Sequence, residues 1–197
     1  MAGIGLRYYA AAKIATETAG SALTYSAGII AGKAVSLNIT YNRSSNPNYG
    51  DDVEVDNDNG LTGITFEATA TGFDDATRVY LLGATEKTGT SGQPSTYVMG
   101  GDASPYVGFG FVQVLREAGV VTYKGYWFYK CLFAEESATM NTKGETIEWQ
   151  NPVLTGRAMG VYDDATGEPH FYEWCTFSGA GAAAAALAWL KGKASIT

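Results

Sequence analysis

The stretch YKGYWFYKCLFAEESATMNTKGETIEWQNPVLTGRAM, from Tyr123 to Met159, decides the fold class of this chain. Its first part alternates at the two-residue period of a β-strand. The alternation predicts one face that carries Tyr123, Trp127, Tyr129, Cys131 and Phe133. Lys124, Tyr126 and Lys130 are expected on the opposite face, because successive side chains of a strand point to opposite sides.

A polar segment, 134–144, separates this strand from a second alternating run. In that run Ile147 and Trp149 point one way, while Thr146, Glu148 and Gln150 point the other. The two runs together predict a long β-hairpin with one apolar and one wettable face, typical of a sheet that covers a core on one side. The predicted core residues of this central hairpin are Trp127, Tyr129, Cys131, Phe133, Ile147 and Trp149.

Length and composition indicate one folded domain, residues 1–197. Hydrophobic residues make up 46% of the chain and charged residues 17%, which is typical of a globular protein with few surface charges. An aromatic share of 13% and 25 glycines favour β-structure with many turns. Few charges and many aromatic residues also suit a subunit that buries its surface against copies of itself.

The formal net charge is -7. An acidic chain is poorly suited to gripping nucleic acid, because lysine and arginine must neutralise the phosphates. Carboxylates could instead line a conduit and repel DNA that slides through it. The alternative reading is that the net charge only keeps the protein in solution.

The two cysteines, Cys131 and Cys175, lie in aromatic-rich strand patterns, so we expect two buried free thiols rather than a disulfide. The N-terminus lacks a basic region followed by an apolar core, so no signal peptide is expected. The longest apolar run, 182–190, is too short to span a bilayer. We therefore expect a soluble protein made in a cytoplasm and not inserted in a membrane.

Further strands are predicted over Leu6–Ile14, Val35–Tyr41, Leu61–Phe73, Tyr106–Arg116 and His170–Phe177. A short flanking helix is predicted over about 74–83, because Asp74 is a suitable N-cap and Gly83 a suitable C-terminal stop. The alanine-rich run predicts a C-terminal helical segment at about 180–191. The segment 84–105 is expected to be a surface loop, being polar and rich in glycine.

The segment NRSSNPNYGDDVEVDNDNG, residues 42–60, predicts a long acidic loop. Its length exceeds that of an ordinary hairpin connection, and such loops are often functional or disordered. Val53 and Val55 could pair briefly as a strand within it. The alternative to a functional loop is that this acidic segment binds no partner.

No residue pattern in the sequence predicts catalysis or a cofactor. His170 is the only histidine, and a lone histidine in an aromatic strand is usually structural. Zinc is not expected, since the chain has too few cysteine and histidine ligands. Asp56 to Gly60, with Glu67 further on, resembles a calcium loop, but the glycine comes one place early and a strand follows. Occasional Ca²⁺ or Mg²⁺ binding by the acidic loop stays open.

The central stretch also carries a resemblance to a known family. The lysine- and aromatic-rich strand is followed by Thr142-Lys143-Gly144-Glu145, then Thr146-Ile147-Glu148-Trp149, Pro152 and Gly156-Arg157. This pattern resembles the major tail proteins, or tail tube proteins, of long-tailed bacteriophages, which are related to type VI secretion tube proteins. The resemblance extends weakly over most of the chain, including Arg7 to Ile14 and the long segment after Tyr41.

The resemblance implies a mainly β fold: a two-sheet β-sandwich or flattened barrel of the tail-tube type, without an appended immunoglobulin-like domain. It implies homohexameric rings that stack into the conduit for DNA ejection, in the virion tail assembled in the bacterial host cytoplasm. The implied partners are the chain itself, the tape-measure protein, the tail terminator and distal tail proteins, and DNA that passes through without sequence-specific binding. The loop implied to stack the rings contains Asn42, Arg43, Asn46, Tyr49, Asp51, Asp52, Asp56 and Asp58.

Two alternatives follow from the same residues. A type VI secretion-like tube protein would share the ring but carry effectors in place of DNA. A carbohydrate-binding β-sandwich would use Trp127, Trp149 or Trp174 as exposed stacking platforms. The alternation places Trp127 and Trp149 on apolar faces, which favours their burial and so the tube reading.

Overall fold

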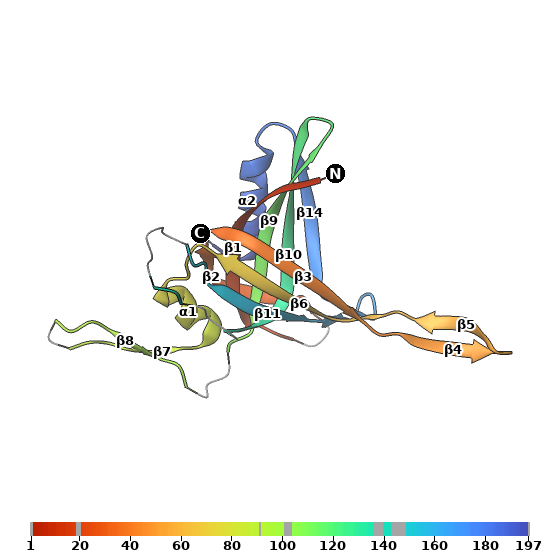
Figure 1. Cartoon of the computed structure of the whole chain (residues 1–197), viewed down its shortest axis with the longest axis horizontal. Coiled ribbons are helices and arrows are strands. Elements are labelled where there is room, and N and C mark those ends of the chain that lie inside the picture. Colours follow the sequence, from red (N-terminus) through yellow and green to blue (C-terminus); the bar gives the residue numbers. More distant parts are fainter. Residues whose placement is uncertain are drawn as a thin grey trace.

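The computed structural model describes residues 2–18, 21–90, 92–100, 104–135, 140–142 and 149–196. One large antiparallel sheet dominates it (Figure 1). Its strands are β1 (Ala2–Thr16), β2 (Thr24–Gly32), β3 (Ala34–Arg43), β6 (Leu61–Ala70), β9 (Val107–Glu117), β10 (Val120–Ala134), β11 (Val153–Met159) and β14 (Tyr172–Ser178). The order across the sheet is β2-β1-β9-β10-β11-β6-β3, and β14 pairs with the first half of β10.

Three two-stranded hairpins and two helices complete the described structure. The hairpins are β4 (Asn46–Gly50) with β5 (Val53–Asp58), β7 (Thr85–Lys87) with β8 (Thr96–Val98), and β12 (Val161–Asp163) with β13 (Glu168–His170). The helices are α1 (Asp75–Leu82) and α2 (Ala182–Lys193). The predictions of a mainly β fold, a short flanking helix and a C-terminal helix are confirmed. The large strands form one curled sheet rather than two separate sheets.

The curled sheet encloses the main core on its concave side. Phe66 of β6 stacks on Phe109 of β9 with ring centroids 5.1 Å apart, and on Phe128 of β10 at 5.5 Å. Phe133 meets the Phe66 ring edge-on at 5.5 Å. The Tyr9 hydroxyl of β1 donates to a backbone carbonyl of β3. Strands β1 and β3, which are far apart in the strand order, therefore meet across the core. Helix α1 adds buried leucines to this cluster.

Helix α2 packs against the convex side of the sheet, where small residues leave room for it. The small residues are Ala10 and Ala12 of β1, Gly108 and Gly110 of β9, and Gly125 of β10. A Cβ added at Gly125 would lie 2.7 Å from the Trp189 ring, and one at Gly108 would lie 2.4 Å from the Trp127 ring. The glycines therefore accommodate aromatic side chains and a helix, and α2 covers what would otherwise be an exposed apolar face.

The central strand does not keep one face along its length, contrary to the sequence prediction. Trp127 and Tyr129 pack with the cluster under α2, whereas Cys131 and Phe133 lie in the main core. The β9–β10 register shifts between Phe128 and Cys131. A β-bulge of this kind inserts one residue and moves every later side chain to the other face, so Trp127 and Tyr129 lie on the α2 side of the sheet while Cys131 and Phe133 lie on the side of the main core.

The predicted return strand of the central hairpin is also wrong in part. Trp149 is 87% exposed and lies outside any strand, so it is not a core residue. Ile147 and the rest of 143–148 lie outside the described residues. The strand that pairs with the end of β10 is β11, with Cys131 opposite Ala158. Its inward side chains, such as Leu154, are small to medium in size and give a weaker alternating pattern than Ile147 and Trp149.

Local capping chemistry explains the position of α1. The Asp74 carboxylate accepts a hydrogen bond from the Thr77 backbone N–H at 2.8 Å, and Gly83 ends the helix in the left-handed conformation. The hydrogen bonds from the Thr77 side chain and backbone lower the pKa of Asp74. Helix α2 continues past Gly192 to Lys193, two residues beyond the predicted end.

Other differences concern polar segments and the thiols. The expected loops at 42–60 and 84–105 contain the β4–β5 and β7–β8 hairpins, which project away from the sheet (Figure 1). Both cysteines are free, as predicted. Cys131 is fully buried, and burial raises the pKa of its thiol, but Cys175 is only half-buried.

Candidate functional site

The β4–β5 hairpin, which we call the arm, is the most exposed ordered part of the chain (Figure 1). It prolongs β3 and β6, and its register places Asn46 opposite Asp58 and Asn48 opposite Asp56. At the tip, Asp51 and Asp52 both adopt positive φ, of 50° and 63°. Aspartate and asparagine are the side chains that best tolerate this conformation in tight turns.

The base of the arm is fixed by polar contacts to the end of β3. The Ser44 backbone N–H donates to the Gly60 carbonyl at 2.8 Å, and the Gly60 N–H donates back to the Ser44 hydroxyl at 3.1 Å. The Arg43 guanidinium donates to the Asn59 carbonyl at 3.1 Å. These contacts hold the direction in which the arm leaves the body.

The arm exposes apolar side chains on a polar hairpin. Tyr49, Val53 and Val55 are 66%, 65% and 69% exposed. Alternation along β5 places the two valines on one face and Glu54, Asp56 and Asp58 on the other. An isolated two-stranded hairpin with apolar residues in water is marginal by itself, so a partner surface would stabilise it.

All residues predicted for the stacking loop lie on the arm or at its base. Asn42 and Arg43 end β3 and pair with β6, whereas the others belong to the arm itself: Asn46, Tyr49, Asp51, Asp52, Asp56 and Asp58. None of the described groups of His, Cys, Asp and Glu is arranged to hold a metal ion.

The large sheet also has strands that pair on one side only among the described residues: β2, β3 and β14. Such strands present free backbone N–H and C=O groups to other chains. Ile30 of β2, and Val35 and Tyr41 of β3, are exposed along these strands. Neighbouring copies could therefore add to the sheet at these edges.

A second projecting hairpin, β7–β8, was not predicted from the sequence. It exposes Tyr97, Val98 and Met99, of which Met99 is 57% exposed. Its strands are three residues each and its sequence is dominated by Gly, Ser and Thr. The only sequence signal for it is the short run Tyr97-Val98-Met99 inside a polar segment.

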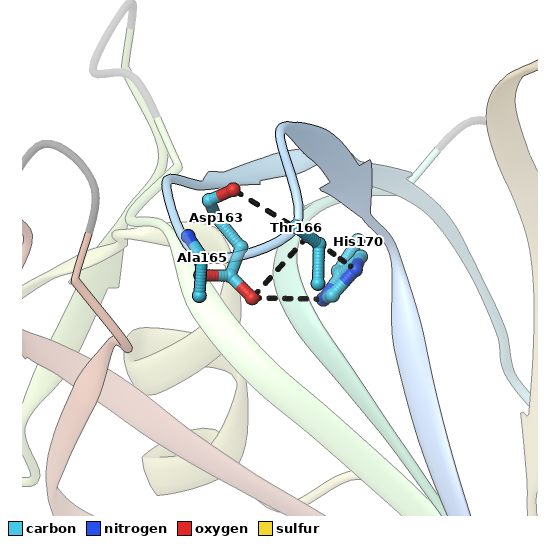
Figure 2. Close-up of polar contacts among 4 residues, drawn as sticks. All are labelled: Asp163, Ala165, Thr166 and His170. Atoms are coloured by element: carbon cyan, nitrogen blue, oxygen red, sulfur yellow. Dashed lines mark hydrogen bonds and ion pairs between the residues drawn. The ribbon is translucent and has the colours of Figure 1, made fainter.

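One turn brings a histidine, a hydroxyl and a carboxylate together (Figure 2). The Thr166 hydroxyl lies 3.1 Å from His170 Nε2, and His170 Nδ1 lies 3.7 Å from Asp163 Oδ2. The order resembles a nucleophile, a base and an acid, but the Asp163–His170 distance exceeds a hydrogen bond. The other oxygen of Asp163 accepts from the Ala165 N–H at 3.0 Å.

These contacts fit the needs of the turn that joins β12 to β13. Gly167 has φ 72° and its N–H donates to the Asp163 carbonyl at 2.8 Å, which closes the turn. Side-chain contacts from Asp163 to the following residues are common in such turns. We interpret the Asp163–Thr166–His170 cluster as a set of polar contacts that stabilises the turn of this hairpin.

No family model matches this chain, and a search of curated proteins finds no match to its sequence. Neither described helix has the length and apolarity to cross a membrane.

Proposed function

We propose that this chain is a structural subunit of a phage tail tube, which assembles into stacked, hexameric rings that form the conduit for DNA ejection. The observation that carries the proposal is the arm, with its rigid base and its exposed Tyr49, Val53 and Val55. Its six-residue strand projects by about 20 Å at the usual rise per residue, enough to reach an adjacent subunit.

Two features support a ring in particular. Closing several subunits edge to edge would pair the backbone groups left free along β2, β3 and β14. The low share of charged residues, 17%, leaves much surface that can be buried between copies. In the ring, the arm would provide the contacts between one layer and the next.

A secretion tube subunit would use the same surfaces, and its cargo would distinguish it. The carbohydrate-binding alternative loses one of its three platforms, because Trp127 is fully buried. Trp174 remains as a platform, being 56% exposed and 5.6 Å from the Tyr172 ring. Trp149 remains as well.

The proposal is tested by polarity changes on the apolar face of the arm. Replacing Val53 and Val55 by threonine keeps their shape and strand propensity but adds hydroxyls. Sedimentation velocity over a concentration series should show association of the wild type and at least tenfold weaker association of the double variant. Val120→Thr is the matched control, since Val120 is 60% exposed but lies far along the chain from the arm. Equal association of the arm variant and the wild type would contradict the proposal.

A further inference from the structure

A cavity of the described structure lies where four segments converge: the start of β2, Tyr129 of β10, the β12–β13 hairpin and the end of α2. Its volume is about 530 Å³. Small-molecule sites usually have volumes of about 300–1,000 Å³ and combine apolar walls with a few convergent polar groups. No residue of the arm lines this cavity, whereas Thr24 and Tyr25 of β2 and Glu173 of β14 belong to strands that the proposed ring would pair.

The walls combine tyrosine rings with charged groups. Tyr25, Tyr129 and Tyr162 line the cavity together with Asp163 and Glu173. The Tyr25 hydroxyl already donates to the Tyr129 backbone carbonyl at 2.8 Å. The Tyr129 hydroxyl makes no hydrogen bond to the described residues, so it is available to a ligand.

Each carboxylate that lines the cavity lies beside a basic side chain. Glu173 forms an ion pair with Lys193 of α2 at 2.6 Å, and the Asp163 carboxylate faces His170 at 3.7 Å. A cation that binds Glu173 would have to displace Lys193. A neutral ligand can instead use the lone pairs and N–H groups that the pairs leave free.

The Tyr129 hydroxyl stays protonated beside these carboxylates. Burial, followed by the negative charges of Glu173 and Asp163, raises the pKa of Tyr129 to about 12. The cavity thus presents strong acceptors on the carboxylates and donors on Tyr129 and Lys193. Hydroxyl groups of a ligand can satisfy both kinds at once, because each hydroxyl donates and accepts.

We propose that this cavity binds a neutral polyhydroxylated ligand, a saccharide of one or two rings. The tyrosine faces would cover the apolar C–H faces of the sugar ring, and the carboxylates and Lys193 would bind its hydroxyls. This site uses none of the tryptophans named as platforms for a carbohydrate-binding sandwich.

The test is a saturation-transfer NMR screen of the whole chain with glucose, galactose, mannose, N-acetylglucosamine and their common disaccharides. Titration of the best ligand is expected to give a dissociation constant in the millimolar range or tighter. Tyr129→Phe removes only the free hydroxyl and should weaken that binding about tenfold, as expected for one lost hydrogen bond. Tyr106→Phe is the control, because Tyr106 is exposed and does not line the cavity.

Three results would overturn the inference. The first is that no saccharide binds up to tens of millimolar, with the protein shown to be folded by circular dichroism. The second is that Tyr129→Phe and Tyr106→Phe affect binding equally. The third is that arginine amide, a cationic probe, binds more tightly than every saccharide, which would make the cavity a cation site.

Discussion

Gly110 of β9 lies directly beneath Leu190 of α2, with no space for a side chain between them: an added Cβ would lie 2.6 Å from Leu190 Cδ1. The same Cβ would lie 2.6 Å from the Trp127 ring and from the Tyr126 carbonyl oxygen. Because the carbonyl belongs to the neighbouring strand, it cannot move aside as a flexible side chain would. The position therefore fixes how closely α2 approaches the sheet.

Gly110→Ala is expected to destabilise the protein by about 1–3 kcal/mol, since overpacking forces neighbours out of their preferred positions. Urea unfolding followed by circular dichroism measures the change. A variant as stable as the wild type would show that α2 is not seated on this face.

Gly192→Ala provides the matched control, with the opposite sign. Gly192 lies within α2, and an added Cβ there would meet no atom within 4 Å. Alanine favours the helix by about 0.5–1 kcal/mol over glycine, so the variant should be more stable in the same assay. A loss of stability would mean that the end of α2 is not helical.

The N-cap of α1 gives a prediction at acid pH. Asp74→Ala should cost about 1 kcal/mol, because the Thr77 N–H loses its acceptor. The pKa of Asp74 is lowered in the folded protein. The stabilisation that Asp74 contributes is therefore fully present above the pKa of aspartate in the unfolded chain, about 3.9. It is lost as pH falls through the lower pKa of Asp74 in the folded protein.

Asp74→Asn separates the cap from the charge. Asparagine caps a helix about as well as aspartate, so this variant should keep its stability at neutral pH and lose the acid-dependent part. Unfolding free energies measured between about pH 7 and pH 3 test this. If Asp74→Asn and Asp74→Ala are equally destabilised at neutral pH, the capping account is wrong.

Several tyrosines predict a loss of stability at alkaline pH. Burial, followed by neighbouring negative groups, raises the pKa of Tyr129 to about 12. Burial also raises the pKa of Tyr9 and that of Tyr25. Unfolded tyrosine ionises near pH 10. Between about pH 10 and pH 12 the unfolded chain therefore holds fewer protons than the folded one, and stability falls as pH rises.

Thermal melts between about pH 8 and pH 11, with tyrosine ionisation followed by absorbance, measure this loss. Tyr129→Phe should make the melting temperature depend less steeply on pH. A melting temperature that stays constant over this range would contradict the burial of these hydroxyls.

The acidic face of the arm gives a prediction about assembly alone. Replacing Asp51, Asp52, Asp56 and Asp58 by asparagine should leave the unfolding free energy within about 0.5 kcal/mol, because these side chains are exposed and asparagine tolerates the positive φ of Asp51 and Asp52. If the arm stacks rings, the variant should assemble less well or with altered salt dependence. Assembly as efficient as that of the wild type would show that the carboxylates take no part in the stacking contact.

Elements governed by local chemistry could be predicted from the sequence. Asp74 and Gly83 mark the ends of α1, because capping depends on residues only a few positions apart. Strand β3 was predicted from the alternation of Leu37 and Ile39 with polar residues.

Elements governed by distant neighbours could not be predicted. The bulge between Phe128 and Cys131 leaves the alternating sequence pattern intact while it reverses which face is buried. Gly108 and Gly110 stand in the sequence as residues without side chains, but the sequence does not show that the groups which approach them are Trp127 and Leu190. The arm is exposed on both faces of β5, so the short alternation of Val53 and Val55 with acidic residues does not show how far the hairpin extends from the sheet.

Negative-stain electron microscopy of the purified, concentrated protein, beside size-exclusion chromatography of a dilute sample, tests the proposed function most directly. The proposal predicts hollow rings or stacked tubes in the concentrated sample and a shift to smaller species on dilution. A strict monomer at every concentration, or particles without a central channel, would contradict it.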